Sequence, residues 1–179
     1  MLRFYLLILL GSVCANKMIT IHPTDNMDFV SDVISNENIY DNMCDDSCPK
    51  SPVGLNFSAL SGNGNVFLEV DINGKPGGLF FFMKKENNVY EVHTALLPNC
   101  RGKNAVDAGR MSAEWAFNNL PCNEIISYSL SDSPQVLVFA KIIGMEEVSR
   151  SMNAHTRHGV EVSKIMLSLK KSKWHSRNN

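Results

Sequence analysis

The stretch over residues 66–97 restricts the fold more than any other part of the chain. Apolar side chains alternate with other residues over 66–72, and the pair Asn73-Gly74 that follows is typical of a two-residue hairpin turn. Further strands are predicted over residues 79–84 and 89–97. Three successive strands joined by short turns indicate an antiparallel meander.

One strand and a helical region precede the meander. The alternating pattern over residues 18–23 predicts a first strand. Thr24 or Asp25 is expected to cap a helix that ends near Asn36. The polar stretch over 38–56 favours a short helix followed by a loop.

A crossover connection is predicted after the meander. Val106, Ala113, Phe117 and Leu120 share one stripe of a helix, and a strand over residues 124–129 follows. Because a helix separates this strand from the last strand of the meander, we expect the two strands to be parallel.

The chain is predicted to end in a helix, a hairpin and a tail. Pro134 suits the first turn of a helix that carries Ala140 and ends at Gly144. Strands over residues 146–151 and 160–169 then flank a polar loop, so a terminal hairpin is expected. The residues after this hairpin are basic and polar, and we expect residues 172–179 to form a flexible tail.

Composition limits the size and the partners of the fold. The 179 residues suit one domain, and 44% hydrophobic residues suffice for its core. Seventeen basic and eighteen acidic residues give a net charge of −1, which disfavours nucleic acid and anionic membranes as partners. The cysteines lack the spacing of a zinc site, so free thiols and no bound metal are expected.

The first 17 residues allow two interpretations. The apolar run that follows Arg3 and the small residues around Ala15 are typical of a secretory signal peptide. Met18 begins the first predicted strand, so residues 1–17 can also be an extension translated from an upstream start. The first interpretation implies export and the second, which we favour, implies a cytoplasmic protein. In both cases the domain is expected over residues 18–171.

The order of these elements resembles the GNAT acetyltransferase superfamily. Residues 96–103, Leu-Leu-Pro-Asn-Cys-Arg-Gly-Lys, resemble the end of the family's central strand and the start of its acyl-CoA pyrophosphate loop. Residues 139–145 resemble its penultimate helix. The resemblance implies an α/β (α+β) fold in one domain, with a mixed central sheet of six to seven strands and helices on both faces. GNAT-like proteins of tailed bacteriophages are also similar.

The resemblance implies acetyl-CoA as cosubstrate and an amine as acceptor, and it leaves a homodimer open. In the family the pyrophosphate is held by backbone amides at a helix N-terminus, where the helix dipole favours an anion. The pantetheine arm lies against free backbone groups of the central strand. The implied cofactor-binding residues are Ala95, Leu96, Leu97, Arg101, Gly102, Lys103, Asn104, Ala105 and Val106. Asn104 and Val106 replace small residues of the family pattern.

Acetyl transfer to an amine needs a base, and Glu91 and His93 are the candidates on the central strand. Their spacing places both side chains on one face of the strand. Two structural roles stay open: Glu91 can pair with a basic neighbour, and His93 can be a histidine satisfied within the sheet. Of the two, Glu91 is expected to carry most of the proton transfer.

One residue of the family's catalytic pattern is missing. The tyrosine that protonates the leaving thiolate in many members corresponds to Ala140 here. The family resemblance as a whole still implies an N-acetyltransferase that acts on a protein N-terminus or a small amine. The alternative is a GNAT-fold protein without catalysis that serves in binding or assembly, and a third reading is a secreted cysteine-containing protein.

Overall fold

The computed structural model describes residues 18–178, and the predicted leader over residues 1–17 lies outside the described residues. One seven-stranded sheet has the order β1-β2-β3-β4-β5-β7-β6. Its strands are β1 (Ile19–Thr24), β2 (Val66–Ile72), β3 (Lys75–Lys84), β4 (Val89–Leu96), β5 (Glu124–Leu130), β6 (Glu146–Arg157) and β7 (Val160–Lys170). The helices are α1 (Met27–Ile34), α2 (Glu37–Met43), α3 (Lys103–Asn119), α4 (Pro134–Ile142) and α5 (Lys171–Asn178), with a 3-10 turn, η1 (Phe57–Leu60).

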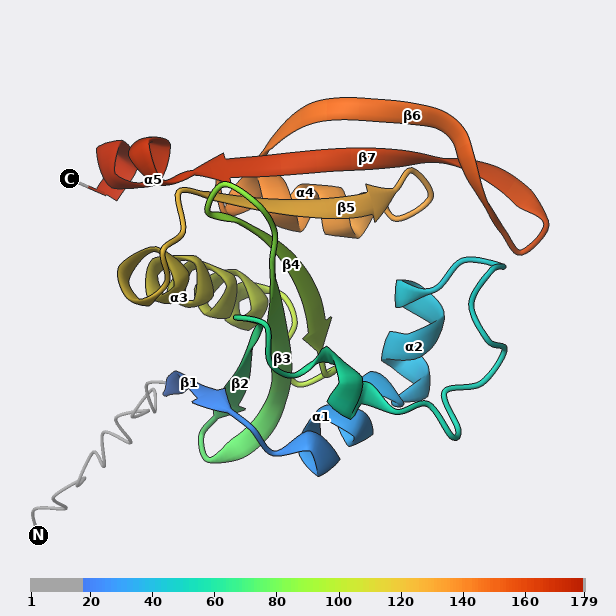
Figure 1. The fold of residues 1–179 in the computed structure, drawn as a ribbon, viewed down its shortest axis with the longest axis horizontal. Helices are drawn as coiled ribbons and strands as arrows, with labels where there is room; N and C mark the ends of the chain where they lie inside the picture. The colour runs from blue at the N-terminus through green and yellow to red at the C-terminus, as the bar shows by residue number, and fades with distance from the viewer. Residues whose placement is uncertain (1–17, 179) are drawn as a thin grey trace, which may run out of the picture.

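Helices cover both faces of the sheet, as predicted (Figure 1). On one face α3 and α4 pack over a core that includes Phe80, Phe82 and Phe117. On the other face α1 and α2 cover a smaller core that includes Phe67 and Phe81. The alternation of β2, β3 and β4 builds both cores, since successive side chains of a strand point to opposite faces.

The N-terminal elements differ from the prediction in detail. β1 pairs antiparallel with β2. The side chain of Asn26, rather than Thr24 or Asp25, caps α1 by accepting a hydrogen bond of 3.1 Å from the Phe29 amide. Asn26 has the better geometry for a cap because it immediately precedes the first helical residue.

The meander is confirmed. The predicted turn has positive φ angles at Asn73 and Gly74, as a type I′ hairpin requires. The second strand begins at Lys75 rather than at residue 79, and a register shift between Val70 and Asp71 accommodates the extra residue of β3. The prediction missed this extension because Pro76 and two glycines interrupt the apolar alternation.

The terminal hairpin is longer than predicted. β6 continues to Arg157, and the predicted polar loop over 152–159 is reduced to a turn at His158 and Gly159, which both have positive φ. β6 is an edge strand and nearly all of its side chains are exposed, so apolar alternation is lacking there. Pairing with β7 makes the segment a strand.

The predicted flexible tail is a helix instead. Residues 171–178 form α5, and Trp174 is only 6% exposed. Its ring packs against Phe117 of α3, with 6.2 Å between ring centroids, and its indole N–H donates to a carboxylate oxygen of Glu114. The hydrophobic burial of one tryptophan therefore fastens this basic segment to α3.

The crossover is confirmed: β5 is parallel to β4, and α3 connects them. Gly144 ends α4 with a φ of 104°, and the amide of Met145 donates to the Ala140 carbonyl at 2.9 Å. Within residues 18–178, each helix is too short or too polar to span a bilayer.

Candidate functional site

The neighbouring strands β4 and β5 separate along their length. They pair only over Val89–Glu91 of β4 and Glu124–Ile126 of β5, although both strands continue beyond these residues. At the point of separation the Ser127 hydroxyl donates to the Val92 carbonyl at 3.0 Å. The result is a V-shaped opening in the middle of the sheet, and Figure 1 shows the two strands diverging.

The backbone groups that face this opening are those of Thr94 and Leu96. The Leu97 amide donates to the Gly77 carbonyl at 2.9 Å, and the Ala95 carbonyl lies against Gly78, so both residues face β3. Backbone groups of successive residues in a strand point to opposite sides, which turns Thr94 and Leu96 toward β5. Of the predicted pantetheine contacts only Leu96 keeps this orientation. Ala95 and Leu97 were assigned to the wrong edge.

The predicted pyrophosphate loop leads from β4 into α3. Arg101, Gly102 and Lys103 are exposed, and Gly102 has a φ of 61° that an L-residue rarely adopts. Among the described residues no side chain caps the helix, so the amides of its first turn, including those of Asn104 and Ala105, remain available to an anion. The Lys103 ammonium lies 2.6 Å from the Asp107 carboxylate.

The two residues that depart from the family pattern do not extend over this helix end. The Asn104 side chain turns back along the loop and donates to the Asn99 carbonyl at 3.2 Å. Val106 packs against the main core. The geometry of the first turn of α3 is therefore compatible with a pyrophosphate despite both substitutions.

A pocket of about 330 Å³ lies at the opening, on the side covered by α2. Its lining comes from β4, β5, β6 and β7, the end of α2 and the loop that follows it, and the start of α4. Glu91 and His93 lie in this lining together with three residues not singled out in the sequence, Tyr128, Lys164 and Asp45. The residues that the sequence predicted as catalytic and the chain segments that were hardest to predict therefore meet in one place.

Glu91 is already paired. One of its carboxylate oxygens lies 2.7 Å from the Lys85 ammonium, and the other lies 3.0 Å from His93 Nε2. The neighbouring His93 ring and the Lys85 ammonium lower the pKa of Glu91 to about 2, although burial opposes this change. A carboxylate with so low a pKa is a weak base at neutral pH.

His93 is placed differently. Its ring stacks on Phe81, with 5.8 Å between centroids, and the side chain is 37% exposed. Nε2 is buried, and although it lies near Glu91 its geometry is not that of a hydrogen bond. Because Nε2 is buried, Nδ1 is the ring nitrogen that a molecule bound in the pocket can contact.

The Glu91 pairing predicts a specific response to acid. A carboxyl whose pKa falls from 4.5 to about 2 on folding stabilises the protein fully above pH 4.5, and this contribution is lost as the pH falls toward 2. We expect Glu91→Gln to lose less stability than the wild type between neutral pH and about pH 3. Urea unfolding at the two pH values measures this difference. Equal losses in the two proteins would contradict the pairing.

Ala140, which stands where the family often has tyrosine, faces a small apolar cavity. The cavity holds about 30 Å³, lies between α3, α4 and the sheet, and is also lined by Thr94 and Ser127 of the opening. Ala140 itself is 3% exposed. This space suits one or two waters and is far smaller than a phenol ring.

Restoring the family residue is therefore expected to fail. Ala140→Tyr should destabilise the protein by about 1–3 kcal/mol, because the ring must displace packed neighbours. Val138→Tyr is the matched control, since Val138 lies on the same helix and is 56% exposed. Urea unfolding of the two variants tests the expectation, and an Ala140→Tyr protein as stable as the control would show that the pocket widens easily.

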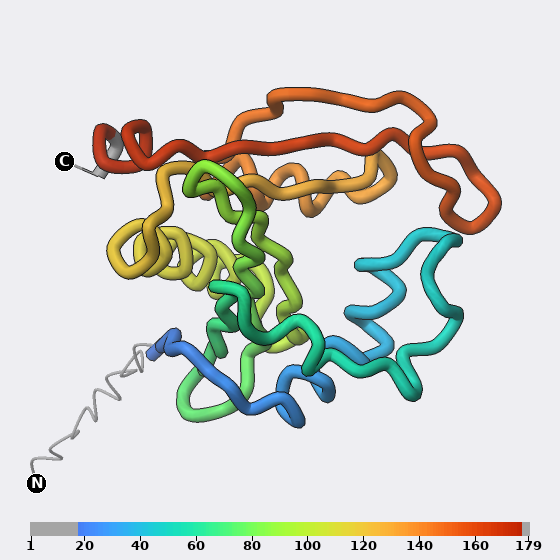
Figure 2. The backbone as a smooth tube through the Cα atoms, in the orientation of Figure 1, coloured from blue at the N-terminus to red at the C-terminus, as the bar shows by residue number. Residues whose placement is uncertain are grey.

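The outer wall of the pocket is held by charged residues of the loop after α2. Asp45 accepts from the Ser47 amide and hydroxyl and pairs with the His155 ring of β6. These contacts, those of Ser47 first, lower the pKa of Asp45 to about 2. The Asp46 carboxylate accepts from the amides of His158 and Gly159 at 2.8 and 3.0 Å. In Figure 2 this loop lies beside the end of the long hairpin.

These wall residues gave little signal in the sequence. Asp45 and His155 are 110 positions apart and each stands in a polar stretch. Lys164 and Tyr128 lie in strands that were predicted, but the pairing of β5 with β7 that brings them together depends on the order of the sheet. Alternation alone could place Tyr128 on a face, not in a pocket.

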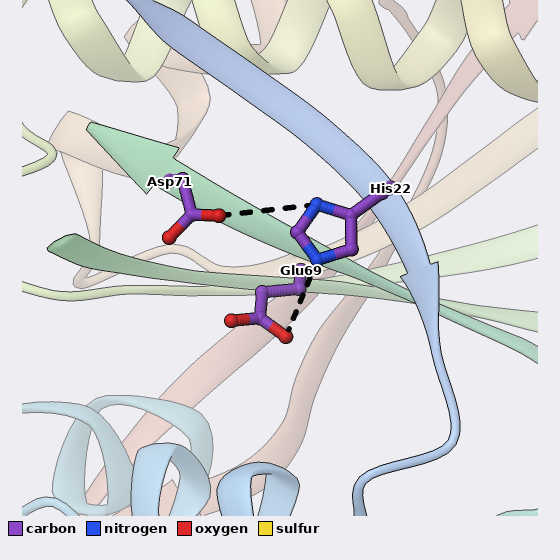
Figure 3. Close-up of side chains that lie close together, drawn as sticks. All are labelled: His22, Glu69 and Asp71. Carbon is purple, nitrogen blue, oxygen red and sulfur yellow. Dashed lines mark ion pairs between the residues drawn. The ribbon is translucent and has the colours of Figure 1, made fainter. Parts of the chain in front are cut away.

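Within residues 18–178, one cluster of potential metal ligands lies elsewhere, on β1 and β2. His22 faces Glu69 through Nε2 at 3.6 Å and Asp71 through Nδ1 at 3.9 Å (Figure 3). The two ring nitrogens face different carboxylates, which suits an imidazole between two acids better than three ligands around one ion. None of the three residues lines either pocket described above.

The seven-stranded sheet, with its opening between β4 and β5, shares its fold with solved N-acetyltransferase structures. The spermidine N-acetyltransferase from Vibrio cholerae, in a structure with CoA and spermine, matches with a TM-score of 0.73 and 15% identity over 88% of this chain and 98% of that chain. A structure of the spermidine/spermine N-acetyltransferase SpeG from Vibrio cholerae with manganese ions gives a TM-score of 0.68 and 13% identity, over 90% and 97% of the two chains. At these identities the likeness shows the fold.

The sequence itself places the chain in a family. Residues 58–177 match the model of DUF2824, described as a protein of unknown function, and the chain belongs to this family. No curated protein sequence gives a significant match.

Proposed function

We propose that this protein is an acetyl-CoA-dependent N-acetyltransferase that acts on a primary amine. The observation that carries the proposal is the opening between β4 and β5. It lies between an uncapped helix N-terminus suited to a pyrophosphate and a pocket that contains His93. The fold shared with the spermidine N-acetyltransferases of Vibrio cholerae supports it.

In this proposal the two ends of the site have separate tasks. The first-turn amides of α3 hold the pyrophosphate, with help from Arg101 and Lys103. The backbone groups of Thr94 and Leu96 hold the pantetheine arm as an added strand. Acetyl-CoA, when bound, supplies an activated acyl group. The amine enters from the pocket beside α2.

The proton transfer is proposed for His93. The amine loses its proton to Nδ1, a bond forms between the amine nitrogen and the acyl carbon, and the carbon–sulfur bond breaks. Glu91 lies beside Nε2 and stabilises the imidazolium that forms, as a positioning residue. The proton taken from the amine finally neutralises the departing thiolate. No tyrosine is required at position 140.

The proposed function is tested by binding and by turnover. Acetyl-CoA at one hundred times its dissociation constant should stabilise the fold by about 2.7 kcal/mol, which raises the melting temperature. Release of CoA thiol with a panel of amines and N-terminal peptides then tests catalysis. Stabilisation without thiol release for any acceptor would favour the second candidate, a GNAT-fold protein for binding or assembly, which Ala140 in place of the tyrosine acid supports.

The pyrophosphate site gives a prediction of its own. The double variant Arg101→Ala, Lys103→Ala should bind acetyl-CoA about tenfold more weakly, because two charge-assisted contacts are lost while the backbone amides remain. Calorimetric titration measures the change. Lys141→Ala is the control, since Lys141 is an exposed lysine in the last turn of another helix, α4. Equal affinities in the double variant and the control would move the anion site elsewhere.

A further inference from the structure

The charged groups that line the acceptor pocket differ in whether they are already paired. Both carboxylates are occupied. One oxygen of Glu91 faces Lys85 and the other faces His93. Asp45 accepts a hydrogen bond from Ser47 and pairs with the His155 ring. A cationic acceptor such as a polyamine would have to displace one of these partners before it could pair with either acid.

Lys164 also lines the pocket, and it differs from the two carboxylates because it has no charged partner among residues 18–178. Its ammonium lies over the Tyr128 ring, 4.1 Å from the centroid. Among residues 18–178, no carboxylate oxygen lies within 4.0 Å of this nitrogen, in contrast to Lys85. The aromatic ring positions the ammonium without neutralising it. The pocket therefore carries one positive charge without a paired acid.

The position of Lys164 sets the length of a suitable ligand. Lys164 belongs to β7, and β5 lies between β7 and the strand that carries His93. Neighbouring strands lie about 4.8 Å apart, so the two backbones are at least about 9.5 Å apart. This separation of the backbones, with the Lys164 side chain turned back over Tyr128 of β5, fits a ligand whose anionic group and reacting amine are several bonds apart.

We propose that the acceptor is an amine that carries a carboxylate or another anionic group several bonds away, and that Lys164 binds this anion. The inference rests on the proposed function for its identification of the pocket as the acceptor site. A peptide or an ω-amino acid has this chemistry, and a polyamine does not. Lys164 thereby sets the specificity, since like charges in a partly buried pocket disfavour a second ammonium.

Three probes of equal chain length test the charge alone: 6-aminohexanoate, hexylamine and 1,6-diaminohexane. The binding of each probe to the full chain is to be measured by calorimetry. The protein is saturated with CoA, so that no acetyl transfer can occur. The wild type should bind 6-aminohexanoate at least about tenfold more tightly than hexylamine, as expected for a hydrogen bond to a charged group, and the diamine most weakly. Turnover with acetyl-CoA should follow the same order.

Variants assign the preference to one side chain. Lys164→Met keeps an apolar stem over Tyr128 and should abolish the preference for 6-aminohexanoate, and Lys164→Glu should reverse it in favour of the diamine. Lys170→Met is the matched control on the same strand, because Lys170 is exposed and does not line the pocket. The melting temperature of each variant should be measured as a check that it folds.

The results separate this inference from the function on which it rests. Lys164-dependent binding of 6-aminohexanoate without any acetyl transfer would support the anion site and reject catalysis. Tighter binding or faster turnover of 1,6-diaminohexane by the wild type would overturn the anion site and leave the acetyltransferase proposal intact. Failure of 6-aminohexanoate to bind, or a preference that survives in Lys164→Met, would also overturn it.

Discussion

Gly78→Ala is expected to destabilise the protein by more than about 3 kcal/mol. Gly78 has a φ of 123° and lies in β3 opposite Leu96. An added Cβ would collide with the Ala95 carbonyl oxygen and would lie 2.7 Å from Leu96 Cα and 3.0 Å from Leu97 N. All three atoms belong to the backbone of the central strand region, so no side-chain rotation can relieve the overlap.

A second glycine of the same hairpin is the matched control. Gly74 also has a positive φ, 74°, but nothing in the described part of the chain lies within 4 Å of its added Cβ. Gly74→Ala should therefore cost only the conformational term, about 1 kcal/mol. Urea unfolding followed by circular dichroism compares the two variants. If Gly78→Ala is as stable as Gly74→Ala, the close approach of β3 to the end of β4 is wrong.

His93→Gln is expected to lower the turnover of acetyl-CoA by about 10²–10⁴-fold, the usual contribution of a general base. The affinity for acetyl-CoA should change little, because His93 lies in the acceptor pocket and the pyrophosphate site is at the α3 N-terminus. The measurements are CoA-thiol release and calorimetric titration. His22→Gln is the control, since His22 is an exposed histidine that lines neither pocket.

Comparison with Glu91→Gln distinguishes the two candidate bases. Loss of the carboxylate should reduce turnover by about tenfold, through weaker stabilisation of the protonated ring, so the effect should be smaller than that of His93→Gln. The opposite order would assign the proton transfer to Glu91, as expected from the sequence. Equal turnover in the wild type and in both variants would reject catalysis at this pocket.

The division of roles between Glu91 and His93 shows what strand alternation can predict. A spacing of two residues placed both side chains on one face, which the distance of 3.0 Å between the Glu91 carboxylate and His93 Nε2 confirms. Alternation carries no information on neighbours from other elements. Lys85, at the start of the β3–β4 turn, pairs with the Glu91 carboxylate. Phe81, on the neighbouring strand β3, stacks against the His93 ring.

The sequence by itself determined the order of elements, the hairpin at Asn73-Gly74, the parallel crossover through α3 and the helix end at Gly144, because each depends on local periodicity or turn chemistry. Only the tertiary structure decided the rest. Residues 171–178 form a helix rather than a flexible tail because Trp174 packs against α3. The polar wall of the pocket exists because Asp45 meets His155 across 110 residues. Contacts between distant polar segments leave no periodic signal, since what stabilises them is a partner that the local sequence does not contain.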